Sequence, residues 1–217
     1  MTEPTRDAGL DAVAIDQYQD LMNDTKRRHD FVGRLDKALD HDRGLVESAA
    51  LQVRMMLENI VYACLVANGQ LLDVEKLRKQ WRIGKILDSL DSALPHDCWP
   101  IPLVLDKSAS PFPHNPRFPG ELKDRPRGDW LTKDECKTAY GKLGDLLHVR
   151  NPLHPDSPDF EGVTRELPTW CEKIAYLLGH HKIASSQQQR MWVVVVNDEG
   201  TQLTKWDQIP APIPIRE

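Results

Sequence analysis

The chain has 217 residues, 40% of them hydrophobic, which is enough to bury a core as one large domain or one domain with an appendage. Its formal net charge of −5 excludes a general basic field that would gather nucleic acid, and leaves only a local basic patch for that purpose. The four cysteines are scattered and form no C-x-x-C pair, which excludes a disulfide framework and favours a reducing compartment.

The first residues, MTEPTRDAGLDAVAIDQYQD, lack the basic region and the apolar run that make up a secretory signal. The longest apolar stretch, residues 60–67, is shorter than the roughly 20 residues that cross a bilayer. We therefore expect a cytoplasmic protein that makes no membrane contact.

The first elements that the sequence predicts are helices. Residues 1–9 are polar and are expected to be loose. Residues 10–39 place apolar side chains at roughly helical spacing, which predicts one long helix or two shorter ones, ended by Gly44. Residues 45–68 are apolar on almost every side, so we expect this helix to lie in the centre of a bundle.

A further helix is predicted over residues 73–94, where Asp73 is suited to be its N-cap. Residues 95–130 then lose every amphipathic period and are rich in proline, although residues 101–105 could form a short edge strand. A loop of this length inside a compact domain is typical of a functional or mobile segment.

The motif LTKDEC starts the next helix, with Thr132 as its N-cap and Glu135 completing a capping box. Gly141 and Gly144 each weaken this helix by roughly 1 kcal/mol relative to alanine. Because glycine has no side chain, it allows another helix to approach closely, so we expect a close neighbour on this part of the helix.

Pro152 cannot lie inside a helix, and it pushes Asn151 out of helical space, so the helix is predicted to end near residues 148–150. Another amphipathic pattern predicts a helix over residues 168–185, with Pro168 in its first turn. Later in the chain, MWVVVVNDEGTQLTKW combines a β-branched run, an Asp-Glu-Gly turn and a second run, which predicts a β-hairpin.

The predicted fold is therefore mainly α, with a helical bundle of about five helices and a C-terminal β-hairpin. The bundle covers residues 10–185 and includes the long proline-rich loop at 95–130, while the hairpin and an extended tail cover residues 190–217. Because a lone hairpin is marginal in water, we expect it to lean on the bundle or on a partner.

Polar side chains gather where the helix after Thr132 ends, at His148, Arg150, Asn151 and His154. A structural explanation is sufficient for His148 and Arg150, because the dipole of a helix favours cations at its C-terminus. The functional explanation is a histidine acid or base, an arginine that holds a phosphodiester and an asparagine that orients them. A metal-independent RNase needs little more than these groups.

A second candidate is the pair Arg54 and Glu58, which lie one turn apart on the predicted central helix. A buried charge must be paired, so the simplest interpretation is an internal salt bridge that fixes the register of the helix. The alternative is a supporting role in a pocket, in which Arg54 lies beside His148 and Arg150.

No metal and no other cofactor is expected. The histidines and cysteines show no H-x-x-x-H, H-E-x-x-H or C-x-x-C spacing, and the pair His180-His181 suits the dipole of a predicted helix end. There is also no G-x-G-x-x-G, Walker or G-x-S-x-G motif.

Two stretches, AALQVRMMLENIVYACLVAN and YGKLGDLLHVRNPLHP, are similar to those of small bacterial helical-bundle proteins and resemble the HEPN superfamily. The signature of that superfamily is an arginine, a polar residue and then a histidine a few residues later. Here Arg150-Asn151 matches the first half and His154 would be the histidine. The spacing is one residue shorter than usual, and Pro152 lies where a helix normally starts.

The resemblance implies a homodimeric bundle that cleaves RNA without a metal, in a bacterial defence or toxin–antitoxin type system. In that case Arg150 stabilises the phosphate, His154 or His148 acts as acid and base, and Asn151 orients them. The same residues also fit a non-catalytic interaction module, in which the bundle dimerises and the hairpin and proline-rich tail recruit a protein partner. The polar cluster then only caps a helix.

Overall fold

The computed structural model describes residues 6–35, 42–69, 82–94, 97–106, 121–126, 128–148, 159–185 and 190–207. These residues form five helices and one five-stranded antiparallel sheet, so the fold is mainly α, as predicted. The helices are α1 (Arg6–Leu35), α2 (Arg43–Asn68), α4 (Ile83–Ala93), α5 (Lys133–Leu147) and α6 (Phe160–Leu178). The strands are β1 (Ile101–Asp106), β2 (Glu121–Asp124), β3 (His180–Ser185), β4 (Arg190–Asn197) and β5 (Gly200–Asp207).

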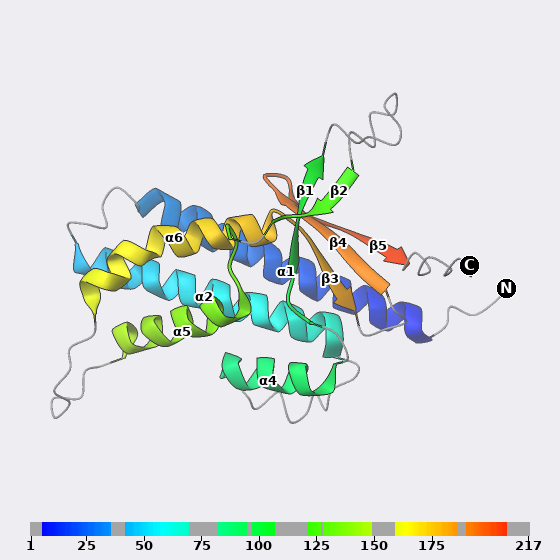
Figure 1. The fold of residues 1–217 in the computed structure, drawn as a ribbon, viewed down its shortest axis with the longest axis horizontal. Coiled ribbons are helices and arrows are strands. Elements are labelled where there is room, and N and C mark those ends of the chain that lie inside the picture. The colour runs from blue at the N-terminus through cyan, green and yellow to red at the C-terminus, as the bar shows by residue number, and fades with distance from the viewer. Residues whose placement is uncertain are drawn as a thin grey trace, which may run out of the picture.

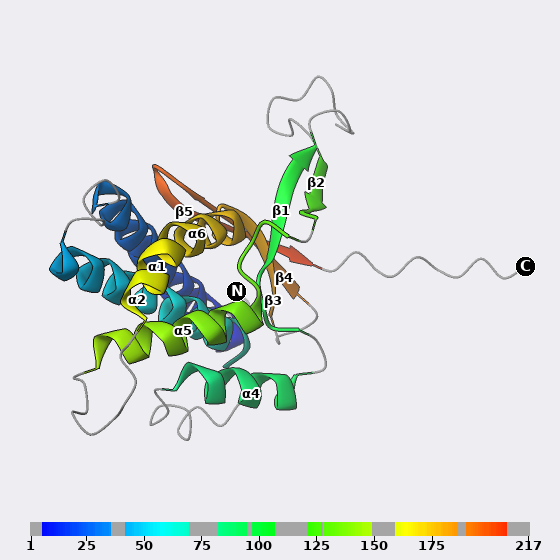
Figure 2. The same ribbon diagram turned by 60° about the vertical axis from the view of Figure 1, so that its left-hand side comes forward.

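The helices lie side by side, and the sheet packs toward one end of them, with β1 and β2 projecting beyond the helical layer (Figure 1). Helix α2 packs against α1, α4, α5 and α6, so it occupies the centre of the bundle (Figure 2). It begins after Asp42, whose carboxylate accepts a hydrogen bond from the backbone of Gly44 at 2.7 Å. Gly44 therefore lies in the first turn of α2 and does not end the preceding helix.

Among the described helices, α2 is also the one that is long and apolar enough to cross a membrane, with a mean hydropathy of 1.3 over its most apolar window. Half of that window is buried inside the bundle, and a central helix of a bundle has the same composition. The uninterrupted apolar stretch at residues 60–67 is much shorter than α2 itself, because the charged residues Arg54 and Glu58 interrupt the apolar sequence of the helix.

The helix predicted over residues 73–94 is described in its second half, where α4 ends at Ala93. Its expected N-cap, Asp73, lies outside the described residues, as does the extended tail after residue 207. The proline-rich segment at 95–130 is not a loop throughout, because it contributes β1 and β2 to the sheet.

The hairpin prediction is corrected by the sheet, whose strand order is β2-β1-β3-β4-β5. Strands β4 and β5 do pair across the turn Asp198-Glu199, with Asn197 opposite Gly200. However, β4 also pairs with β3, from Val195 opposite His180 onward, so the hairpin is only one edge of a larger unit. The expected edge strand at residues 101–105 is β1, which lies between β2 and β3 and is therefore not an edge.

The helix predicted over residues 168–185 is wrong at both ends. Helix α6 starts at Phe160, because the carboxylate of Asp159 accepts a hydrogen bond from the backbone of the first turn. Pro168 thus lies inside α6, where it removes one hydrogen bond of the helix without ending it. Residues 180–185 leave the helix and form β3, because β4 supplies a strand partner that local patterns do not reveal.

The sheet is joined to α1 by polar contacts between residues far apart in the sequence. The backbone N–H of Thr201 donates to Asn23 Oδ1 at 2.9 Å, and the Thr201 carbonyl accepts from Gln19 Nε2 at 3.1 Å. The Tyr18 ring packs edge-on against Trp192, with 5.5 Å between the ring centroids. These contacts hold β4 and β5 against α1 and bury the side chains between them.

Candidate functional site

A surface pocket of about 520 Å³ lies between α2, the start of α4 and one face of α5. We call it the α5 pocket. Helix α5 begins with the predicted capping box, in which Thr132 and Glu135 bind each other's backbone. The residues that follow face the pocket at spacings of three and four. Those that bear on its chemistry are Arg54, Arg82, Lys137, Tyr140, Gly144, Asp145 and His148.

Arg54 is held at the wall of this pocket by two side chains. Its Nε lies 3.5 Å from Glu58 Oε1, and its Nη2 donates to the Tyr140 hydroxyl at 2.8 Å. That hydroxyl in turn donates to Glu58 Oε1 at 2.9 Å. The guanidinium carbon lies 4.0 Å from the centroid of the Tyr140 ring. Arg54, Glu58 and Tyr140 form a closed set, the Arg54 triad, which gives the guanidinium one orientation.

The protonation of Tyr140 preserves this arrangement. Burial raises the pKa of the Tyr140 phenol, and the hydrogen bond to the Glu58 carboxylate raises it further. The phenol therefore keeps its proton at neutral pH and continues to donate to Glu58. Its oxygen remains available as the acceptor for Arg54.

Gly144 leaves room for the remaining nitrogen of Arg54. A Cβ atom at this position would lie 2.6 Å from Arg54 Nη1, a distance that requires one of the two to move. Gly141, almost one turn earlier, is exposed, and a Cβ atom there would meet nothing within 4 Å. The expected close neighbour is therefore present at Gly144, where it is Arg54 of α2, and none of the described residues plays this part at Gly141.

The structure contains the Arg54–Glu58 ion pair of the first interpretation, and it also places Arg54 and His148 in the lining of one pocket, as the second interpretation expected. His148 is the C-cap of α5 and is exposed, and its backbone N–H donates to the Gly144 carbonyl at 3.0 Å. Glu58 contacts Arg54 but does not line the pocket. The other predicted site residues, Arg150, Asn151 and His154, lie outside the described residues.

Sequence reasoning missed Lys137, Tyr140 and Arg82 as members of this site. A usable signal was present, because Lys137, Tyr140, Gly144 and His148 follow one another at spacings of three or four residues on one helix face. Lys137 forms an ion pair with Asp88 of α4 at 2.8 Å, a contact between helices that no local pattern predicts.

Another cluster, Asp91, Asp97 and Cys98, has ligand atoms within 4.8 Å of one another, as a metal site would require. The Lys133 ammonium lies 2.7 Å from Asp91 and 2.8 Å from Asp97. Burial alone would lower the pKa of Lys133, but hydrogen bonds to both carboxylates raise it. The cluster thus contains its own cation and is best explained as a structural link between α4 and α5.

His181 is not at a helix end, as the sequence suggested, but on β3 and fully buried. Its Nδ1 donates to the Leu178 carbonyl at 2.9 Å, so Nε2 accepts from the Tyr18 hydroxyl at 2.7 Å. Burial lowers the pKa of His181 to about 4. The side chain is therefore neutral at physiological pH and serves the packing of the sheet on α1.

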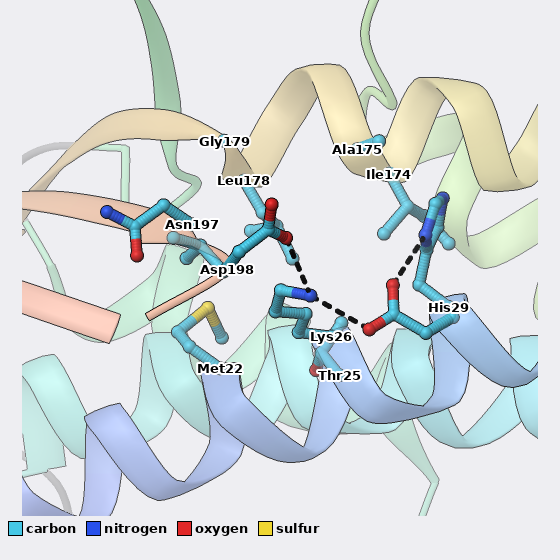
Figure 3. Close-up of a pocket in the computed structure, with 12 residues that line it drawn as sticks. Met22, Thr25, Lys26, His29, Ile174, Ala175, Leu178, Gly179, Asn197 and Asp198 are labelled. Atoms are coloured by element: carbon cyan, nitrogen blue, oxygen red, sulfur yellow. Dashed lines mark hydrogen bonds and ion pairs between the residues drawn. The ribbon is translucent and has the colours of Figure 1, made fainter. Parts of the chain in front are cut away.

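A second hollow, the α1–α6 groove, lies on the other side of the bundle. Figure 3 shows Lys26 and His29 of α1 facing Ala175 of α6, with Asp198 at one end. Two adjoining cavities of about 220 and 450 Å³ share His29 and Ala175. The Lys26 ammonium pairs with Asp30 at 2.8 Å and Asp198 at 3.3 Å, so its charge is already neutralised.

Comparison with protein families, with curated proteins and with solved structures finds no match to this chain. The geometry of the chain's own residues is therefore what indicates a function. Of the two hollows, the α5 pocket combines a fixed guanidinium with an exposed imidazole, and this combination decides which chemistry to propose.

Proposed function

We propose that the chain is a cytoplasmic, HEPN-like helical domain of a bacterial defence or toxin–antitoxin type system, and that it cleaves RNA without a metal. The observation that carries the proposal is that Arg54 and His148 line one open pocket at the end of α5. If His148 only ended α5, there would be no need for Arg54 of α2 to lie in the same pocket.

In this proposal Arg54 donates to a phosphate oxygen and stabilises the charge that develops there. An imidazole can both accept and donate a proton, so His148 is suited to take the proton of the 2′-hydroxyl or to protonate the leaving 5′-oxygen. The 2′-oxygen attacks the phosphorus, the bond to the 5′-oxygen breaks, and a cyclic phosphate forms. Arg150, Asn151 and His154 are proposed to complete the site.

The test is RNA cleavage by the purified protein in EDTA. We expect His148→Ala, His154→Ala and Arg150→Ala to lose about a hundredfold or more in rate, because each removes a proton donor or a phosphate contact. Arg54→Lys keeps the charge but loses the planar fork, and is expected to lose about tenfold. Circular dichroism of each variant should match the wild type. A wild type that cleaves no RNA in a broad panel contradicts the proposal.

The α1–α6 groove favours a second candidate function, a non-catalytic module that dimerises or binds a protein partner. Its floor combines apolar side chains such as Ile174 and Leu178 with small ones such as Ala175, a surface that suits an inserted apolar side chain. The test is sedimentation equilibrium of the wild type and Ala175→Arg. A wild-type dimer that dissociates in the variant supports this second function. A monomeric wild type contradicts dimerisation through the groove.

A further inference from the structure

The charges around the α5 pocket nearly cancel. Arg54 is paired with Glu58 and Lys137 with Asp88, and Arg82 also has an interaction partner. Asp145 adds a third carboxylate beside the three cations. A groove that follows a nucleic-acid backbone needs cations that are free to replace counterions along several phosphates. Among the residues that the structure describes, this pocket does not offer them.

What the pocket does offer is one nitrogen of Arg54. Its Nε faces Glu58 and its Nη2 is used by Tyr140, while the described residues provide no hydrogen-bond acceptor for Nη1. Nη1 occupies the space that a side chain at position 144 would fill, which glycine leaves free. Arg54 and Gly144 both line the pocket, together with His148. A guanidinium that is held by two partners at the wall of a pocket, and whose third nitrogen has no acceptor among the described residues, is suited to bind one oxyanion.

From this we infer that the α5 pocket takes a single phosphate group, held by Arg54 Nη1 above Gly144 and next to His148, and does not bind a polyanionic backbone along its length. Tyr140 is a positioning residue, because its hydroxyl fixes the guanidinium without lying on the ligand. The inference rests on the proposed function only for the identity of the oxyanion. The phosphate belongs to an oligonucleotide or to a free phosphate compound, and the two sources are separable by experiment.

The first experiment measures binding of inorganic phosphate and of decauridylate in EDTA by isothermal titration, over a range of salt concentrations. For single strands, the logarithm of the binding constant falls with the logarithm of the salt concentration by about 0.7 per phosphate contacted. One or two contacts predict a slope shallower than about −2. A steeper slope for decauridylate, or no binding of either probe, overturns the inference. Binding of inorganic phosphate alone identifies a free phosphate compound as the source.

The second experiment compares two alanine substitutions on the same helix. Gly144→Ala places a Cβ atom against Arg54 Nη1, so phosphate binding should weaken about tenfold or more. Gly141 also lines the pocket, but a Cβ atom there lies more than 4 Å from Arg54 and from every other described residue apart from its own helix, so Gly141→Ala should bind phosphate as the wild type does. Equal affinity for the two variants overturns the inference.

Tyr140→Phe tests the same point without adding an atom. It keeps the ring under the guanidinium and removes the hydroxyl that fixes it. Phosphate affinity should fall about three- to tenfold while the midpoint of urea unfolding changes little, a separation that a purely structural role would not produce. An unchanged affinity overturns the role of Tyr140.

The outcomes for the inference and for the proposed function remain distinct. If the protein cleaves no RNA but binds phosphate in a way that depends on Gly144, the phosphate site is supported and the nuclease function is contradicted. If the protein cleaves RNA and its binding of decauridylate depends steeply on salt, the nuclease function is supported and the single-phosphate site is contradicted.

Discussion

Helix α2 takes part in an arginine network on each of two flanks, one around Arg28 of α1 and one around its own Arg54, and the Arg54 network borders the α5 pocket. Toward α1, Arg28 donates with Nε to Asp24 at 2.6 Å and with Nη1 to Gln52 at 2.6 Å and Met55 Sδ at 3.0 Å. Asp24 also accepts from Asn59 at 2.8 Å. Toward α5, the Arg54 triad uses Nε and Nη2 and leaves Nη1 beside a hollow.

The difference separates a structural network from a binding site. Both arginines are partly buried and both are paired with an acid one turn away, so neither burial nor pairing distinguishes them. The distinguishing feature is the pocket, which Arg54 lines and for which Gly144 leaves the room. Each arginine leaves one terminal nitrogen without a hydrogen bond among the described residues, Nη2 in Arg28 and Nη1 in Arg54. Because Arg54 lines the α5 pocket, its spare donor is placed for a ligand, whereas the Arg28 network serves the packing of α1 on α2.

The largest effect is expected from a third network, the pair Tyr18 and His181. An unfolded histidine has a pKa near 6.5, and burial lowers that of His181 to about 4. Above pH 6.5 both states are neutral and the stability is complete. As the pH falls from 6.5 to 4, only the unfolded chain gains the proton, so His181 costs about 3 kcal/mol of stability by pH 4.

Urea unfolding at pH 7, 5.5 and 4 measures this loss. His181→Gln should show a shallower pH dependence than the wild type, because it no longer carries the titrating group. His180→Gln removes an exposed neighbour that lowers the His181 pKa less than burial does, and should retain most of the wild-type dependence. An identical dependence in the wild type and His181→Gln would show that His181 does not set it.

The next effect tests the Arg28 network between α1 and α2. Asp24→Ala removes the acceptor shared by Arg28 and Asn59, and should lower the free energy of unfolding by about 2 kcal/mol. Phosphate affinity should not change, because this network does not reach the α5 pocket. Asp20→Ala, at an exposed position of the same helix, is the control and should change stability by less than about 0.5 kcal/mol. Equal losses in the two variants would break the comparison.

A smaller effect tests the Arg54 network. Glu58→Gln keeps an oxygen that accepts from the Tyr140 hydroxyl but removes the negative charge beside Arg54. Phosphate should then bind about fivefold more tightly, equivalent to about 1 kcal/mol of reduced repulsion. Glu47→Gln is the matched control, since Glu47 pairs with Arg43 on the same helix at the same spacing and away from the pocket. Phosphate titrations of both variants provide the measurement, and weaker binding by Glu58→Gln would contradict the prediction.

The smallest effect concerns a cation near the pocket that does not line it. Lys142 of α5 pairs with Glu166 at 2.7 Å, and both side chains are about half exposed. Lys142→Ala should change the free energy of unfolding by less than about 0.5 kcal/mol and the phosphate affinity by less than about twofold. A larger loss of affinity would mean that the general charge of α5, and not the orientation of Arg54, attracts the ligand.

Local signals predicted part of the fold. The capping box at Thr132 and Glu135 and the turn at Asp198-Glu199 both depend on neighbours in the sequence, and both are found in the structure. Strand β3 was missed because its residues become a strand only through pairing with β4. Pro168 misled the start of α6 for a related reason: Asp159 supplies a stronger local cap earlier in the chain.

The candidate site divides in the same way. The i to i+4 spacing predicts that Arg54 can reach Glu58, and the end of α5 at His148 follows from the nearby Pro152. That Tyr140 joins Arg54 to Glu58 depends on the packing of α5 on α2, across more than 80 residues of sequence. Sequence periodicity does not predict a contact between two separate helices, so the Arg54 triad could be identified only from the structure.

The contacts of Thr201 with Asn23 and Gln19 also constrain the timing of folding. The partners are separated by 178 and 182 residues, so a ribosome must synthesise almost the whole described region before α1 meets β5. Until β3 and β4 have been synthesised, Tyr18 of α1 lacks His181 and Trp192, the residues that it contacts in the final structure. Loop closure over this length slows assembly, so the nascent chain exposes an apolar face of α1 for most of its synthesis.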